Sequence, residues 1–290
     1  MSINQNILLA GQNYVDDAVI TGGPTESGYP LSYLQTMEMW QFMRFASVVS
    51  ANTYLVLEFS ETKILQLFAA LKHSLSPVGK WRIRVGTTQS DVTSTPLYDS
   101  GWVKITPSFS GYGTLPWGEW NWGEVLPAEY SNILNRNGWH IAPDPVYGKV
   151  VRIDFDDALE NEFGYLQMAR LWLGSVYQPS VNVPYGAKII PIEKTKVREA
   201  ESGVRFYGTR YLRRVLSMSF DLPIKELLYY IFGPLYAVNG RAGEVVAILQ
   251  PLDPETFLFE AVYGNLRDMP EVTHISWDRL GSDLFIDERV

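Results

Sequence analysis

Alternating hydrophobic and polar residues dominate the chain between residues 53 and 173. The clearest example is the segment Lys80–Val85. There Trp81, Ile83 and Val85 share one face of an extended strand, and the basic residues between them share the other. The same alternation occurs in Thr53–Phe59, Lys63–Phe68 and Lys149–Phe155. Strands that bury one face and expose the other are typical of antiparallel sandwiches, so this region predicts a β-sandwich.

A domain boundary is predicted near residue 180, because Gln178–Gly186 contains two prolines and a glycine between periodic segments. We therefore expect one domain over residues 1–180 and a smaller, β-rich domain over residues 181–290. The second domain contains one predicted helix near residues 222–233. Asp221 is suited to cap this helix, Pro223 to its first turn, and Gly233 to its end.

Composition excludes several classes of function. The formal net charge of −8 argues against nucleic-acid binding, which needs a positive surface. The chain has no cysteine, so it has no disulfide, thiolate metal site or cysteine nucleophile. Residues 1–10 lack the basic start of a secretory signal, and no apolar stretch approaches the roughly 18 residues of a membrane span. We therefore expect a soluble protein, made in a cytoplasm and not inserted in a membrane.

Catalytic signatures are absent from the sequence. His73, His140 and His274 lie far apart, without the short spacing of a metal site. Asp154 and Asp156 form the one carboxylate cluster of interest, because on a strand they would lie about 6–7 Å apart, within the range of glycosidase pairs. A calcium loop and ordinary strand-end carboxylates are the alternatives. We expect no enzyme activity, no metal site and no cofactor.

An aromatic loop, Ser108–Glu124, interrupts the strands and is the candidate binding site. Its candidate ligand or partner contacts are Phe109, Tyr112, Trp117, Trp120 and Trp122. Three interpretations remain open: a cap of buried rings over the sandwich, a protein interface, or a glycan contact.

The N-terminal part resembles the discoidin-like, galactose-binding-like jelly rolls. The resemblance rests on Trp40 ahead of the first core strand and on three segments: Thr53–Phe59, Lys80–Val85 and Tyr98–Trp102. The order of further pieces is similar to that in a group of tailed-phage virion proteins. These pieces are Lys72–Arg84, Tyr98–Trp102, Trp117–Trp122, Arg152–Asp154 and Gly164–Gly174.

The resemblance implies a mainly β protein, with an N-terminal jelly-roll sandwich followed by a smaller domain of a β-sandwich and one helix, similar to tail tube and distal tail modules. It implies a structural component of a phage tail tip or baseplate, located in the virion tail. Such a protein would assemble into a homo-oligomeric ring and contact other tail proteins. The alternative is a non-catalytic module that binds a host-surface glycan, and a glycoside-active enzyme is a third possibility.

Two structural expectations accompany this interpretation. Trp40 is expected to be buried in the core of the sandwich. The oligomer contacts are expected on the second domain, where the strands Gly203–Phe220 and Glu244–Leu249 would offer free edges. Residues 1–180 alone should then form a folded monomer.

Overall fold

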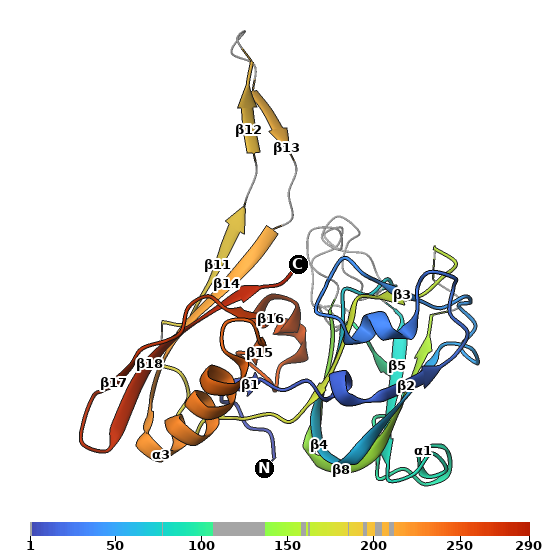
Figure 1. Cartoon of the computed structure of the whole chain (residues 1–290), viewed down its shortest axis with the longest axis horizontal. Helices are drawn as coiled ribbons and strands as arrows, with labels where there is room; N and C mark the ends of the chain where they lie inside the picture. Colours follow the sequence, from blue (N-terminus) through green and yellow to red (C-terminus); the bar gives the residue numbers. More distant parts are fainter. Residues whose placement is uncertain are drawn as a thin grey trace, which may run out of the picture.

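The computed structural model of the 290-residue chain describes residues 2–76, 78–106, 137–157, 161, 163–184, 186–193, 196–200, 205–208 and 212–290. The candidate loop residues Phe109, Tyr112, Trp117, Trp120 and Trp122 lie outside this range. The described chain consists mainly of antiparallel strands, arranged in two large sheets and two short ribbons (Figure 1).

The first sheet has the strand order β10-β4-β8-β5-β6, with β2 on β4 and β7 on β5. Its strands are β2 (Val19–Gly22), β4 (Tyr54–Leu71), β5 (Lys80–Gly86), β6 (Tyr98–Asp99), β7 (Val103–Lys104), β8 (Gly138–Asp156) and β10 (Arg170–Gly174). The short elements around it are η1 (Tyr14–Asp17), η2 (Leu31–Gln35), α1 (Asp91–Ser94) and the ribbon of β3 (Met43–Arg44) with β9 (Gln167–Met168).

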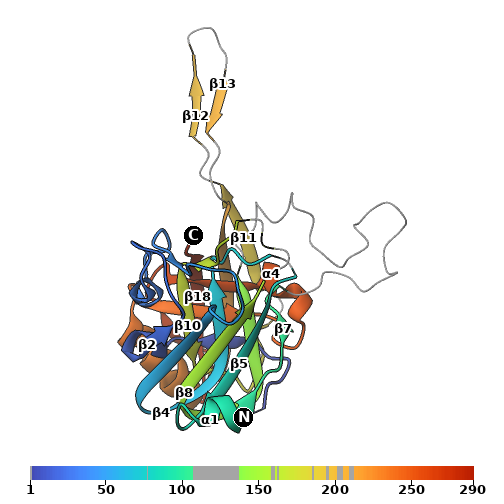
Figure 2. The ribbon, with the colours of Figure 1, turned by 90° about the vertical axis from the view of Figure 1, so that its right-hand side faces the viewer.

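The long strands β4 and β8 curl the first sheet around its core. Their register shifts between Glu58 and Lys63 and again between Leu65 and Leu67, and such irregularities bend a strand. One half of β4 therefore pairs with β2 and the other half with β10. Figure 2 shows β4, β8 and β5 side by side along the molecule.

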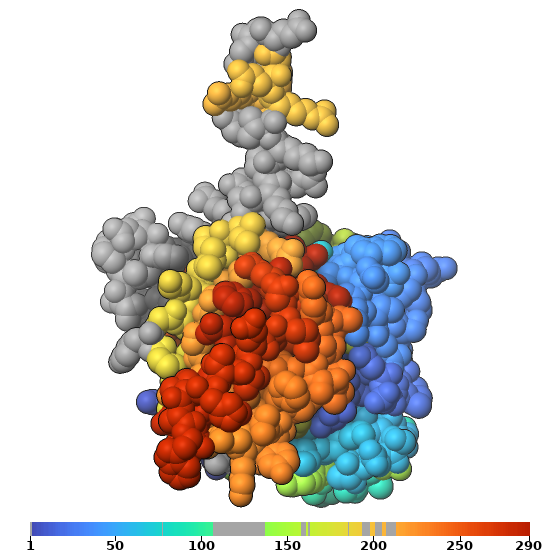
Figure 3. All heavy atoms as spheres, turned by 60° about the vertical axis from the view of Figure 1, so that its left-hand side comes forward, coloured from blue at the N-terminus to red at the C-terminus, as the bar shows by residue number. Residues whose placement is uncertain are grey.

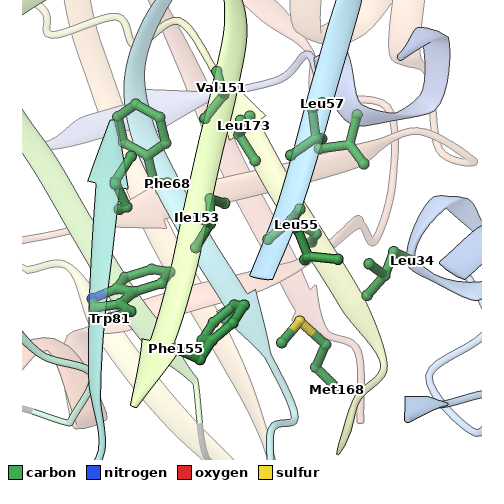
Figure 4. Close-up of a cluster of buried hydrophobic side chains, with 14 of the residues drawn as sticks. Leu34, Leu55, Leu57, Phe68, Trp81, Val151, Ile153, Phe155, Met168 and Leu173 are labelled. Atoms are coloured by element: carbon green, nitrogen blue, oxygen red, sulfur yellow. The ribbon is translucent and has the colours of Figure 1, made fainter. Parts of the chain in front are cut away.

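The core of this sandwich lies between the first sheet and the β3–β9 ribbon with η2. Trp81, Ile83 and Val85 are fully buried, as the alternation in the sequence predicted. Figure 4 shows Trp81 and Ile153 of the sheet facing the same cluster as Met168 of β9. The predicted fold class, mainly β with an N-terminal jelly-roll sandwich, is confirmed.

The second sheet has the strand order β1-β15-β16-β18-β14-β11, with β17 on β18. Its strands are β1 (Leu8–Ala10), β11 (Lys188–Glu193), β14 (Leu212–Pro223), β15 (Glu244–Ile248), β16 (Ala261–Leu266), β17 (Val272–His274) and β18 (Arg279–Glu288). The helical segments of this part are α3 (Ile224–Glu226), η3 (Leu227–Asn239), η4 (Pro254–Thr256) and α4 (Phe257–Glu260). A hairpin of β12 (Lys196–Glu199) and β13 (Arg205–Gly208) projects from this part (Figures 1 and 2).

The helix of the second part differs from its predicted bounds. Asp221 and Pro223 end strand β14, and the Asp221 carboxylate accepts a hydrogen bond from Arg279 Nε at 2.7 Å instead of capping the helix. The helix continues past Gly233 as a π-helix and ends before Gly240, which has a positive φ of 56°. It continues because Leu235 and other residues of its last turns are buried in the core, and this burial outweighs local propensity.

A third buried cluster joins the two sheets. Leu8 of β1, Val246 of β15 and Tyr263 of β16 pack against Leu67 of β4 and Trp172 of β10. Strand β1 pairs with β15, so the first strand of the chain belongs to the second sheet. The proposed division into residues 1–180 and 181–290 remains a prediction, and β1 crosses that division.

Two further expectations are wrong. Trp40 is 70% exposed rather than buried, because its backbone lies in a surface turn ahead of β3. Strands β14 and β15 do not supply the expected free edges, because β14 lies between β18 and β11 and β15 lies between β1 and β16. Strand β13, in the first of the two segments, pairs only with β12 and keeps a free edge, and the placement of oligomer contacts in this part stays a prediction. Among the described strands of the second sheet, β11 occupies an edge. In the part of the chain that the structure describes, no helix has the length and hydropathy to cross a membrane.

Candidate functional site

An exposed indole lies just before strand β3. The Trp40 Nε1–H group donates a hydrogen bond to Glu38 Oε2 at 2.9 Å, although the ring is 70% exposed. The turn is closed by a backbone hydrogen bond from Gln41 N to Glu38 O at 3.0 Å. The indole is therefore held in one orientation by its polar edge, while its apolar surface faces solvent.

Four residues further on, Arg44 lies between two tyrosine rings. Its guanidinium carbon is 4.1 Å from the centre of the Tyr29 ring and 3.9 Å from the centre of the Tyr165 ring. Its NH1 group donates to Glu26 Oε2 at 3.1 Å, and NH2 donates to Gln167 Oε1 at 3.0 Å. Cation–π contacts on both faces and hydrogen bonds at the edge fix this arginine and both rings.

The β3–β9 ribbon explains this arrangement. Met43 pairs with Met168, and Arg44 pairs with Gln167. Both methionines are buried in the sandwich core, so the neighbouring residues Arg44 and Gln167 point outward. The backbone of Arg44 also binds the preceding loop, since its N–H donates to Tyr29 O at 3.3 Å.

Phe163 extends this group of rings. It is 54% exposed, and its ring centre lies 5.9 Å from that of Tyr165 at an interplanar angle of 34°. We call the set of rings and their polar partners the aromatic platform: Glu26, Tyr29, Glu38, Trp40, Arg44, Phe163, Tyr165 and Gln167. The Cα atoms of Trp40 and Arg44 are at most about 14 Å apart, since Arg44 is four positions after Trp40 in the chain.

The chemistry of the aromatic platform is that of recognition. Its exposed rings offer flat apolar surfaces, and the carboxylates of Glu26 and Glu38 accept hydrogen bonds. The sequence analysis placed the site on the loop Ser108–Glu124, and that prediction is untested because those rings lie outside the described residues. It missed Arg44, whose partners are remote in the sequence, and Phe163, whose ring partner Tyr165 lies two residues away. The proximity of Glu38 to Trp40 and that of Phe163 to Tyr165 were the local signals.

The carboxylate cluster at Asp154 has a structural role. Asp154 is buried and accepts from Arg84 NH2 at 2.6 Å and from Arg152 Nε at 2.9 Å. Asp157 is also buried and accepts from Ser76 N at 2.8 Å. Two guanidinium groups bind the Asp154 carboxylate, which thereby links β5 to β8. Within the described residues no group of three or more histidine, aspartate or glutamate side chains forms a candidate metal site.

His140 lies in an aromatic environment on β8. Its Nε2 atom is 2.6 Å from the hydroxyl oxygen of Tyr98, and the rings of Phe68 and Trp81 lie beside it. Burial lowers the pKa of His140 from its usual 6.5 to about 4. The imidazole is therefore neutral at physiological pH and serves the packing of the sandwich.

A buried ionic network connects the two sheets. Arg170 of β10 has no exposed surface and donates from NH1 and NH2 to Asp16 of η1 at 2.6 and 2.8 Å. It also donates from Nε and NH2 to Glu244 of β15 at 3.1 and 2.6 Å. The Tyr263 hydroxyl donates to the same Glu244 carboxylate. Burial alone lowers the pKa of Arg170, but the two carboxylates outweigh it and hold this pKa above its usual value.

Comparison with known proteins gives a limited picture. No family model matches the chain, and no curated protein matches it. Among solved structures, it is similar to chitosan-binding module 1 from a chitosanase/glucanase of Paenibacillus sp. IK-5, with 12% identity over 57% of this chain and 99% of that chain and a TM-score of 0.34.

Two other solved structures give similar values. The family 32 carbohydrate-binding module of Clostridium perfringens NanJ, in complex with galactose, has 8% identity over 58% of this chain and 100% of that chain, with a TM-score of 0.35. A fucolectin from striped bass (Morone saxatilis) serum has 11% identity over 67% of this chain and 58% of that chain, with a TM-score of 0.38. At these values the likeness carries no argument about what this chain binds.

Proposed function

We propose that this protein is a non-catalytic glycan-binding protein and that the aromatic platform of its jelly-roll part is the binding site. The observation that carries the proposal is the state of Trp40. This indole is 70% exposed, yet its orientation is fixed through its hydrogen bond to Glu38. A ring that is both exposed and fixed is suited to binding, because little side-chain freedom is lost when a ligand covers it.

Saccharides match the chemistry of this surface. A pyranose ring has apolar C–H faces that pack on aromatic rings and hydroxyl groups that bind carboxylates around its edge. The platform supplies exposed rings in Trp40 and Phe163, and carboxylates in Glu26 and Glu38. Hydrogen bonds to ionised groups are stronger than those between neutral groups, so these carboxylates favour a hydroxyl-rich ligand.

The proposal is tested by a glycan array with the full chain, followed by calorimetric titration of the glycan retained. Trp40→Ala and Phe163→Ala should each weaken binding by about tenfold or more, the effect of losing a ring that contributes about 1.4 kcal/mol. Neither change should lower the melting temperature appreciably, because both rings are exposed.

Trp277→Ala is the matched control. Trp277 is 90% exposed, but it lies in the turn between β17 and β18 of the second sheet. The Trp277→Ala variant should bind glycan as tightly as the unmodified chain does. The proposal is wrong if no glycan is retained, or if all three changes weaken binding equally.

We propose an assembly role as the second candidate, in which the protein is a structural part of a virion tail tip or baseplate and contacts other tail proteins. The observation that favours assembly is the β12–β13 hairpin, which stands clear of the body of the molecule (Figures 1 and 2). Light scattering and negative-stain imaging of the full chain should show a ring. A monomer at all concentrations contradicts this second candidate and leaves the first untouched.

A further inference from the structure

A groove of about 470 Å³ lies on the second sheet, near the end of β14. Its floor includes Ser219 and Asp221 of β14 with Asp283 and Phe285 of β18. Its wall is the segment between β16 and β17, together with Ile275. Figure 3 views the molecule from the side on which these C-terminal residues, coloured red, form much of the surface.

The groove is acidic. Its described lining contains no lysine or arginine. Four carboxylates line the groove: Asp221, Asp268, Glu271 and Asp283. Arg279 binds Asp221 at 2.7 Å from outside the lining, and Arg241 lies 3.6 Å from Asp268. Asp283 accepts only a hydroxyl hydrogen bond, from Ser219 at 2.5 Å. Among the described residues, Glu271 and Asp283 have no ion-pair partner, so the groove has uncompensated negative charge.

The groove also has an apolar rim. Ile275 is 58% exposed, and Met269 is exposed beside it. Exposed apolar side chains that border unpaired carboxylates suit a partner with both basic and aromatic groups.

The β12–β13 hairpin has this composition. Arg198 and Arg205 are exposed, and Phe206 is 60% exposed. Residues 194–210 contain five basic and two acidic residues, in a chain whose formal net charge is −8. The Arg205 guanidinium contacts Glu199 at 3.1 Å, but both groups are exposed and remain accessible to a partner. A two-stranded hairpin is only marginally stable by itself, so packing against another surface would stabilise it.

The hairpin and the groove lie at opposite ends of β14. The hairpin precedes Leu212, where β14 begins, and the groove is formed by Ser219 and Asp221 near its end. Seven residues of extended strand separate Leu212 from Ser219 by about 23 Å. The hairpin extends away from the β17–β18 end of the sheet, which borders the groove, so the groove of a second copy is the accessible one (Figure 1).

We propose that the hairpin of one copy docks in the acidic groove of a second copy. Arg198 and Phe206 lie directly opposite each other in the ribbon and share one face, so Arg198 would face Glu271 and Asp283 while Phe206 packs against the apolar rim. This contact joins two different surfaces, so it propagates head to tail and closes into a ring or extends into a filament. Pro191 on the edge strand β11 disfavours the competing mode, in which two copies pair edge to edge. The proposal goes beyond the glycan site, which lies at the β3–β9 ribbon of the jelly-roll part.

Charge reversal in the full chain tests the contact. Arg198→Glu should weaken self-association by about tenfold or more, as should Glu271→Arg with Asp283→Arg, because each places like charges together. All three changes in one chain should restore association, since the charges are complementary again. Arg198→Lys is the control that keeps the charge. Sedimentation in low salt measures association, and a thermal melt confirms that each variant is folded.

Cysteine cross-linking provides an independent measurement, because the chain has no native cysteine. A mixture of Phe206→Cys and Ile275→Cys chains should give a cross-linked dimer with a short bis-maleimide reagent, and neither variant alone should do so. Cross-linking of Phe206→Cys chains alone would indicate hairpin-to-hairpin contact and overturn the proposal. A monomeric native chain, or no rescue by the combined charge reversal, would also overturn it.

Discussion

At the residue scale, Arg170 shows how a buried charge can define the packing of two sheets. Its guanidinium binds Asp16 on one side and Glu244 on the other, with Leu34 O as a further acceptor at 3.2 Å. Burying a charge is costly unless it is paired and hydrogen-bonded, and here Arg170 meets both conditions. The network forms only when β10 of one sheet lies against β15 of the other, so it favours one arrangement of the two sheets.

Removing the Arg170 charge should therefore be costly. Arg170→Met keeps an apolar chain but removes the cation bound most closely to the buried Glu244, leaving only Arg289 at 3.9 Å, so the free energy of unfolding should fall by about 3–5 kcal/mol. Arg205→Met is the control, because its pair with Glu199 is exposed and should contribute less than about 1 kcal/mol. Urea denaturation measures both. Equal small losses would show that the network does not stabilise the fold.

His140 should make stability depend on pH. Its pKa is about 4 in the folded chain and near 6.5 when exposed, so below pH 6.5 the unfolded chain takes up a proton that the folded chain does not. The free energy of unfolding is then highest above pH 6.5 and falls as the pH drops toward 4, by up to about 3 kcal/mol.

His140→Gln isolates this effect. Glutamine retains a hydrogen-bonding group near Tyr98 but does not titrate. The decrease in the free energy of unfolding between pH 7 and 5 should therefore be smaller in the variant than in the native chain. Urea denaturation at several pH values gives the comparison. An unchanged pH dependence would show that another group is responsible.

At the element scale, the end of η3 depends on one glycine. Gly240 has φ 56° and ψ −155°, a backbone conformation that residues other than glycine rarely adopt. Its N–H donates to Tyr236 O at 3.1 Å and closes the last turn. Gly233 lies inside the helix without positive φ, although its sequence position suggested a stop.

The two glycines should therefore respond differently to alanine. Gly240→Ala should cost about 1–3 kcal/mol because the backbone must adopt a strained conformation. Gly233→Ala should be neutral or stabilising by up to about 1 kcal/mol, since a Cβ there would meet Leu228 O at an ordinary 3.4 Å and alanine favours helix. Melting temperatures test the contrast, and a larger loss at Gly233 would contradict it.

At the scale of the whole molecule, the two sheets share a buried interface. The cluster around Leu8, Trp172 and Tyr263 is buried between them, and the Arg170 network crosses the same interface. Interfaces that are large and apolar couple the stability of their two sides. This coupling changes the expectation for residues 1–180, because that fragment lacks the β15 partner of β1.

Calorimetry of the full chain should therefore show a single unfolding transition. A fragment of residues 1–180 should melt at lower temperature and associate, because its half of the joint cluster is exposed. Light scattering of the fragment gives its mass. Two separate transitions in the full chain, together with a stable monomeric fragment, would show that the jelly-roll part is independent.

The sequence by itself determined the strands of the jelly roll. Period-two alternation is a local property, and it correctly placed Trp81, Ile83 and Val85 in the core. It also identified a helix after β14, because apolar residues and a proline near its start lie within a few residues of one another.

Tertiary structure decided which segments meet. Strand β1 joins β15 across more than 200 residues of sequence, Arg44 meets Tyr165 across the β3–β9 ribbon, and Trp40 remains at the surface. The helix continues past Gly233 because Leu235 is buried by strands distant in the sequence. Local patterns record which face of a segment is apolar. They do not record which distant segment covers that face, and contacts of this kind form the aromatic platform and the Arg170 network.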